Sequence, residues 1–241
     1  MDQLETMPLD WSQALAIAAH PDDLEYGAAG AVAAWTDAGK DVRYLLVTRG
    51  EAGIDTLAPD ECAPLREAEQ RAGASEVGVS VVEFLNHHDG VIEYGVALRR
   101  DLAAAIRRHQ PELVIIGNFH DTWPGGGLNS PDHRHVGRAG LDAVADAGNR
   151  WIFPELAEQG LQPWRGVRYV AVSGSPQPTH AVDISSTLDK SVASLEAHKA
   201  YLEALGEHPM ASAREFLEWM ADLNAPLFGG RRAATFELFR M

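Results

Sequence analysis

The pattern of apolar segments in this chain of 241 residues predicts an α/β fold, with a doubly wound, mostly parallel sheet and helices on both of its faces. Two observations support this prediction. Short runs of Val, Ile, Leu and Ala alternate with longer segments that end at glycine or proline. Most of the short runs are apolar without interruption, as expected for strands that helices cover on both sides.

Five strands and four helices are predicted to alternate along the first two-thirds of the chain. The strands cover residues 15–19, 42–48, 81–85, 113–117 and 167–173. The helices cover residues 27–38, 64–72, 97–109 and 131–147. Gly39, Gly73 and Gly148 follow three of these helices, and Pro111 follows the remaining one. Both residue types are common where helices end.

The last third of the chain has a different pattern. Amphipathic helices are predicted over residues 188–205 and 213–223, and a late strand over residues 235–239. Prolines and glycines lie between these elements, but no low-complexity linker separates them from the rest. We therefore predict a single domain over residues 1–241, in which the part from about residue 175 forms a C-terminal helical cap.

Composition limits the classes of partner. The chain has 35 acidic and 20 basic residues and a net charge of −15, which disfavours nucleic acid and anionic membranes and favours a cation. It has one cysteine, Cys62, and therefore no intramolecular disulfide. The amino-terminal segment lacks the basic and apolar regions of a signal peptide, and no apolar run approaches a membrane span. We expect a cytoplasmic protein; the sequence leaves a homo-oligomer open.

The segment His20-Pro21-Asp22-Asp23 directly follows the first predicted strand. Ligands of open α/β sheets bind at the carboxyl ends of the strands, so an imidazole and two carboxylates lie where such a fold does chemistry. His and Asp both bind zinc, and the spacing of His20 and Asp23 allows both to reach one ion. The alternative is a polar turn without function, because Pro and Asp also favour turns.

A third ligand is predicted at His133. Ser130 has the character of a helix N-cap and Pro131 of the first helical position, which places His133 in the first turn of a helix. His135 lies about 200° further around that helix and should point elsewhere. The alternative is an ordinary histidine near a helix start.

Two loops, residues 50–64 and 120–130, are expected on the same rim of the sheet as His20. The second contains Gly125-Gly126-Gly127 but lacks the Lys-Ser/Thr of a phosphate-binding loop. No dinucleotide-binding glycine pattern surrounds Gly27. Trp123 and Trp164 fall in predicted loops, where an indole either stacks on a sugar or packs against the protein.

These segments resemble the PIG-L, or LmbE-like, family of zinc-dependent N-deacetylases and amidases. The matching pieces are Ala19-His20-Pro21-Asp22-Asp23, Thr48-Arg49-Gly50-Glu51-Ala52-Gly53 and Pro131-Asp132-His133-Arg134, with weaker matches at Arg66, Glu69, Asp89, Lys190 and His198. The resemblance implies a Rossmann-like fold and a zinc ion bound by His20, Asp23 and His133. It also implies that Asp22 is the general base, and that Arg66 and Asp89 contact a sugar or another polar substrate.

One position departs from the family. Many members have a histidine directly before the Pro-Asp-His triplet, where it stabilises the oxyanion or protonates the leaving amine. This chain has Ser130 there, and a serine cannot carry a positive charge. The role of the histidine is therefore either lost, which leaves Ser130 at that position, or filled by another residue. The candidates are His88, His120 and His180, the last also as a substrate contact.

Two histidines and one carboxylate leave an open position on zinc, as in hydrolytic sites. Zinc lowers the pKa of bound water to about 7, and Asp22 is adjacent to accept its proton. We therefore expect one zinc per chain, although another divalent metal such as iron, cobalt or nickel fits the same ligands. The expected reaction is N-deacetylation of an N-acetylated amino sugar or glycoside. The alternatives are an amidase of a thiol–sugar conjugate and a non-catalytic binding protein that keeps the fold.

Overall fold

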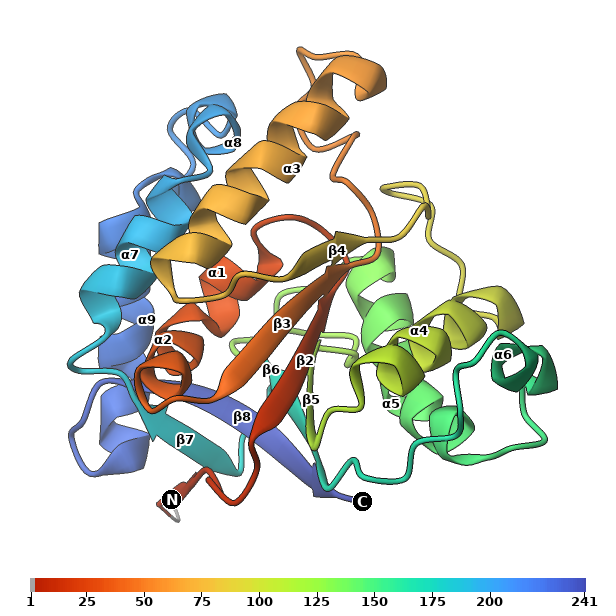
Figure 1. Ribbon diagram of the computed structural model, residues 1–241. Coiled ribbons are helices and arrows are strands. Elements are labelled where there is room, and N and C mark those ends of the chain that lie inside the picture. Colours follow the sequence, from red (N-terminus) through yellow and green to blue (C-terminus); the bar gives the residue numbers. More distant parts are fainter. Residues whose placement is uncertain (1–2) are drawn as a thin grey trace.

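The computed structural model describes residues 3–241 and has a central sheet between two layers of helices (Figure 1). Among the described residues the sheet has eight strands in the order β1-β7-β8-β6-β5-β2-β3-β4. The five predicted strands pair in parallel with one another and confirm the α/β fold. They are β2 (Gln13–Ala18), β3 (Asp41–Leu46), β4 (Val82–Phe84), β5 (Leu113–Gly117) and β6 (Tyr169–Ser173).

The C-terminal third supplies strands as well as helices. β8 (Ala233–Arg240) contains the predicted late strand and pairs antiparallel with both β6 and β7 (His180–Asp183). β1 (Glu5–Thr6) pairs in parallel with β7 at the sheet edge. β1 and β7 were not predicted, because each is too short for a periodic pattern.

The helices cover the two faces of the sheet unequally. One face carries α1 (Asp23–Gly27), α2 (Ala29–Asp37), α3 (Pro59–Glu76), α7 (Leu188–Glu196) and α9 (Ala213–Asn224), with α8 (Lys199–Ala204) beside α3 (Figure 1). The other face carries α4 (Val96–His109), α5 (Pro131–Gly148) and α6 (Pro154–Glu158). Two apolar cores separate the helices from the sheet, and β2 contributes alternate residues to each. No helix within residues 3–241 is long and apolar enough to cross a membrane.

Three helix boundaries differ from the prediction. The helix predicted over residues 64–72 begins at Pro59, which takes the first helical position and leaves Pro64 inside the helix. The loop expected over residues 50–64 is therefore shorter. The helix predicted over residues 27–38 begins at Ala29 as α2, because the preceding short helix α1 ends at Gly27. The helix predicted over residues 188–205 is interrupted at His198.

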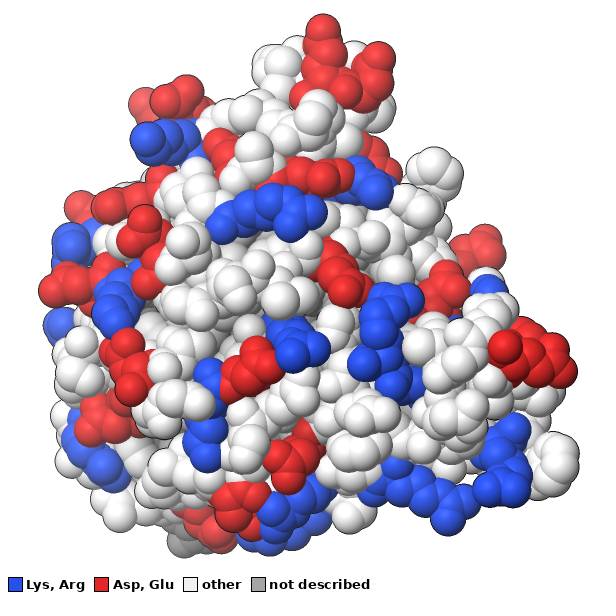
Figure 2. All heavy atoms as spheres, in the orientation of Figure 1, with Lys and Arg blue, Asp and Glu red and all other residues white. Residues whose placement is uncertain are grey.

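Charged residues are dispersed over the surface. Figure 2 shows Asp and Glu side chains interspersed with Lys and Arg over the face in view. β2 lies between β3 and β5, so the segments that follow these strands meet at one rim of the sheet. The candidate site lies at this rim.

Candidate metal centre

Asp23 is held by the turn that follows β2. Its Oδ2 atom accepts hydrogen bonds from the backbone N–H groups of Ala19 (3.0 Å) and His20 (2.9 Å). These two bonds leave Oδ1 directed at His133 Nε2, at 2.9 Å. Asp23 also begins α1, where the helix dipole favours a negative charge. The turn therefore fixes this carboxylate with one oxygen free for a ligand.

His20, Asp23 and His133 bring three donor atoms together, as the sequence predicted. His20 Nδ1 and His133 Nε2 are 3.3 Å apart, and the ligand atoms of the three residues all lie within 4.8 Å of one another. Two ligands of a tetrahedral zinc ion, each about 2.0–2.1 Å from the metal, are themselves about 3.3 Å apart. The spacing of the two imidazole nitrogens therefore fits a single ion between them.

The outer nitrogens of both imidazoles face oxygen acceptors. His20 Nε2 lies 3.0 Å from Asp132 Oδ2 and 3.0 Å from Asp89 Oδ1. His133 Nδ1 lies 3.1 Å from Asn129 Oδ1. Protons on these outer nitrogens leave His20 Nδ1 and His133 Nε2 bare and facing each other beside Asp23. This arrangement calls for a cation, so the donor set fits a divalent metal.

The charges of the cluster agree with this conclusion. Burial alone would lower the pKa of His20, but hydrogen bonds to Asp132, Asp23 and Asp89 hold that pKa well above its usual range. Burial would raise the pKa of Asp23, but the neighbouring His133 and His20 hold it well below its usual range. The carboxylates thus demand positive charge at this point, which either protonated imidazoles or a metal ion supplies.

Asp22 is buried next to Asp23 and pairs with Arg66. Its backbone is in the left-handed region, with φ of 88°. Its Oδ2 atom accepts a hydrogen bond from Arg66 Nη2 at 2.9 Å. Burial raises the pKa of Asp22 to about 7, although Arg66 partly offsets the effect. A carboxyl group with such a pKa can both accept and return a proton near neutral pH.

Arg66 is placed differently from the sequence prediction. Its side chain is 2% exposed, binds Pro21 O and Asp22, and stacks against the ring of Tyr201 at 4.1 Å. An arginine buried in this way holds Asp22 and has little surface left for a substrate. The structure therefore favours a supporting role for Arg66 over the expected substrate contact.

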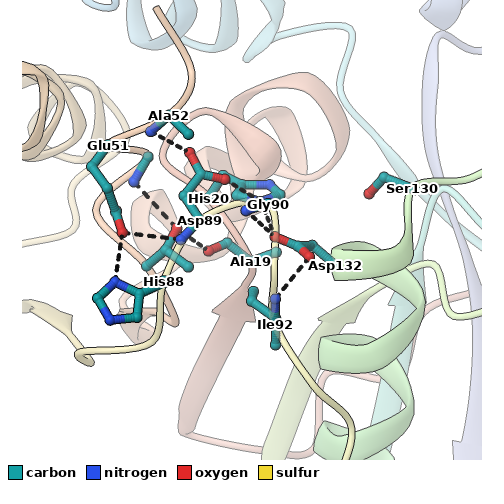
Figure 3. Close-up of polar contacts among 12 residues, drawn as sticks. Ala19, His20, Glu51, Ala52, His88, Asp89, Gly90, Ile92, Ser130 and Asp132 are labelled. Atoms are coloured by element: carbon teal, nitrogen blue, oxygen red, sulfur yellow. Dashed lines mark hydrogen bonds and ion pairs between the residues drawn. The ribbon is translucent and has the colours of Figure 1, made fainter. Parts of the chain in front are cut away.

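Asp89 lies at the rim of the cluster. Its Oδ2 atom accepts the backbone N–H of Ala52 at 3.0 Å, and its own N–H donates to Glu51 Oε1 at 3.0 Å. Figure 3 shows Asp89 and Asp132 converging on His20, with Glu51 also facing His88. Asp89 thus joins the segments after β3 and β4 to His20, one of the predicted metal ligands.

The candidates for the replaced histidine lie in different places. Ser130 is the N-cap of α5 and accepts the backbone N–H of His133, so its hydroxyl sits beside a ligand without contacting the other residues drawn in Figure 3. His120 stacks on Phe119, and its Nε2 is 2.7 Å from Glu237 on β8. His88 is 86% exposed in its side chain.

His180 lies on β7, four strand positions from β2, or about 19 Å at the usual strand spacing. Its Nε2 atom faces Glu5 at 3.6 Å. The structure therefore does not bring His180 to the cluster, and the expected substrate contact has no support in this geometry.

Sequence reasoning missed two supports of the ligands. Asp132, one residue before His133, accepts the N–H groups of Gly90 (2.7 Å) and Ile92 (3.1 Å) as well as facing His20. Asn129 orients His133 and donates from Nδ2 to the carbonyls of Asn118 and His120. Asp132 lay within the quoted Pro-Asp-His motif, so its position was a usable signal. Asn129 carried none.

A partly exposed indole lies beside the cluster. The rings of Trp123 and His133 meet edge to face with centroids 5.5 Å apart. Trp123 also lies against Gly174, where an added Cβ would be 2.6 Å from Trp123 Cζ3. Only glycine at position 174 leaves room for the Trp123 ring at this distance, so Gly174 helps to hold the indole beside His133.

Comparison with known proteins agrees with the geometry. Residues 15–144 match the family described as GlcNAc-PI de-N-acetylase, PIG-L. Diacetylchitobiose deacetylase of Thermococcus kodakarensis is 31% identical over 194 residues, which cover 79% of this chain and 70% of that protein. A probable N-acetyl-α-D-glucosaminyl L-malate deacetylase 2 of Bacillus cereus is 28% identical over 217 residues, covering 86% of this chain and 93% of that protein.

Solved structures share the fold at lower sequence identity. N,N'-diacetylchitobiose deacetylase of Pyrococcus horikoshii superposes with a TM-score of 0.86 and 24% identity, covering 96% of this chain and 85% of that one. GalB, a 4-carboxy-2-hydroxymuconate hydratase of Pseudomonas putida, superposes with a TM-score of 0.73 and 19% identity, covering 95% of this chain and 97% of that one. Because a hydratase shares this fold, the fold alone does not identify the reaction.

Proposed function

The chain belongs to the PIG-L family, and from this premise we propose that it is a zinc-dependent N-deacetylase of an N-acetylated amino sugar or glycoside. One observation carries the proposal. Two imidazole nitrogens and one carboxylate oxygen lie within 4.8 Å of one another, and the buried carboxyl group of Asp22 follows Pro21 in the same turn. This combination provides a metal position and a proton acceptor side by side.

The chemistry divides between the ion and the protein. A zinc ion bound by His20, Asp23 and His133 supplies a polarised water and a Lewis acid for the amide carbonyl. In the proposed reaction Asp22 takes a proton from the attacking water and returns it to the leaving amine. Arg66 keeps Asp22 oriented, and Asp132 and Asp89 keep His20 oriented. Ser130 or His120 remains a prediction for the group that stabilises the oxyanion.

The relatives support a small sugar-containing substrate. The named relatives act on N-acetylated sugar derivatives, diacetylchitobiose and an N-acetylglucosaminyl malate. Trp123 offers a partly exposed aromatic face beside His133, which suits the apolar face of a sugar ring. We propose that Trp123 contacts the sugar and that Asp89 binds one of its hydroxyl groups. We also propose that residues 1–241 form one domain, since β7 and β8 join the same sheet as β2.

Metal analysis combined with acetate release tests this function. The purified chain is assayed with N,N'-diacetylchitobiose and N-acetylglucosamine before and after chelation. About one zinc per chain, with acetate release that chelation abolishes and zinc restores, supports the proposal. Zinc without acetate release favours the thiol–sugar amidase, which a thiol–sugar amide substrate then tests. A chain that binds no divalent metal favours the non-catalytic binding protein.

A further inference from the structure

Gln70 links the turn that carries Asp22 to the helix beneath it. Gln70 lies on α3 and is fully buried. Its Oε1 atom accepts the backbone N–H of Asp22 at 3.0 Å, and its Nε2 atom donates to Glu25 Oε1 at 2.8 Å. One side chain thus bridges the residue expected to act as base and a carboxyl group on α1.

The backbone at Asp22 needs such a support. Asp22 is one of three residues other than glycine with a positive φ among those described, and a left-handed conformation is unfavourable for residues with a side chain. Asp22 is also 5% exposed, so its N–H group has little access to water. The hydrogen bond to Gln70 satisfies that N–H and fixes the plane of the peptide before Asp22, which sets the direction of its side chain.

Glu25 packs in turn against His198, which lies between α7 and α8. Its Oε2 atom lies 3.7 Å from Nε2 of His198, and both side chains are fully buried. Gly73 on α3 permits this approach, since an added Cβ there would lie 2.7 Å from Ser194 O and 3.1 Å from His198 Nε2. His198 thus closes the space behind Glu25 and limits how far Glu25 can retreat from Gln70.

We propose that Gln70 is a positioning residue for Asp22, with Glu25 and His198 as its buried supports. The inference rests on the proposed function, because it takes Asp22 as the proton acceptor. It assigns a role to His198, which the family resemblance singled out and which the site chemistry leaves unused. Arg66 holds the carboxylate of Asp22, whereas Gln70 holds its backbone.

Two variants separate this role from ordinary packing. Gln70→Met keeps the volume of the side chain but loses both hydrogen bonds. Gln70→Glu keeps an acceptor for the Asp22 N–H. Ser194→Ala is the matched control, because it removes a buried hydrogen bond, Ser194 Oγ to Gly73 O at 2.7 Å, from the same α3–α7 contact. Each is prepared as the zinc-loaded full chain, with zinc content and Tm measured.

The first readout is kinetic. Gln70→Met should lower kcat about 10- to 100-fold with KM within about twofold of wild type, as expected when a reacting group is misplaced by a fraction of an ångström. Gln70→Glu should recover at least part of that loss, and Ser194→Ala should leave kcat unchanged. A Gln70→Met enzyme with unchanged kcat, or a Ser194→Ala enzyme with an equal loss, overturns the proposal.

The second readout does not depend on activity. Hydrogen exchange measured by mass spectrometry follows peptides that contain residues 20–24, where the Asp22 N–H is protected by Gln70. Exchange should accelerate in Gln70→Met and remain slow in Gln70→Glu and Ser194→Ala. If the wild-type chain released no acetate, the proposed function would fail while exchange still decided whether Gln70 holds Asp22. Unchanged exchange in Gln70→Met overturns the proposal; if that variant does not fold, Gln70→Asn, too short to bridge both partners, takes its place under the same criterion.

Discussion

The turn over residues 19–25 and the loop over residues 121–128 both border the candidate metal centre, but they are built differently. In the turn, the side chains of Asp22 and Glu25 are buried and their backbone or side-chain atoms are hydrogen-bonded. In the loop, residues 124–128 are exposed, and Leu128 is 85% exposed. A buried, bonded turn suits groups that must hold one geometry for chemistry. An exposed loop can vary without disturbing them, so we assign reaction to the turn and substrate preference to the loop.

Among the variants that test this division, Asp22→Asn should have the largest effect. Asparagine tolerates the left-handed backbone, so the turn should keep its shape and its metal while losing the proton acceptor. We expect kcat to fall about 10²- to 10⁴-fold with zinc content unchanged. Steady-state kinetics and elemental analysis measure both. Full activity in Asp22→Asn would exclude Asp22 as the base and leave the turn with a purely structural role.

The pH dependence should come from the turn as well. The base form of Asp22 is the ionised one, so kcat/KM should rise as pH increases through the pKa of that group. Burial sets this pKa at about 7, and the charge of a bound cation lowers it, so the acid limb should lie at about pH 7 or below. Kinetics from pH 5 to 9, with zinc content checked at each pH, locate the limb. Activity that falls with rising pH across this limb contradicts the assignment.

Asp132→Asn should weaken the metal site without changing the loop. The variant loses a carboxylate that orients His20, and changes of this kind typically reduce metal affinity about 10- to 100-fold. Competition with a chromogenic chelator measures the affinity. Asp142→Asn is the control, because Asp142 lies on the same helix and contacts Tyr94 at the surface. Equal affinities for both variants and wild type would show that Asp132 serves only the backbone of residues 90–92.

Trp123→Ala should give the smallest effect, and one on KM alone. Loss of an aromatic contact worth about 0.5–1.5 kcal/mol corresponds to a rise in KM of about 2- to 13-fold for a sugar substrate. Trp151→Ala is the control, since Trp151 is exposed beyond the end of α5. A loss of kcat or of zinc in Trp123→Ala would mean that the loop also supports His133, and the division between turn and loop would fail.

The sequence alone predicted those parts of the candidate site that lie in one motif or next to a recognisable strand or helix. His20 and Asp23 follow a recognisable strand, and His133 lies in the first turn of a helix with an N-cap, so all three could be expected at the same rim of the sheet before any contact was known. Gln70 could not, because its role depends on α3 crossing over the turn after β2, and no local pattern records that crossing. The burial of Arg66, which disfavours the expected substrate contact, likewise results from tertiary packing and could not be predicted from the sequence.

The position of β8 also affects how the protein is made. β8 lies between β6 and β7, so within residues 3–241 β7 and the β1 strand that pairs with it are hydrogen-bonded to the rest of the sheet only through β8. During synthesis, both strands leave the ribosome before β8 does. Until β8 emerges, β1 and β7 cannot pair with the rest of the sheet. A nascent chain at that stage exposes the edge of β6. The sheet can therefore be completed only after residues 233–240 have emerged.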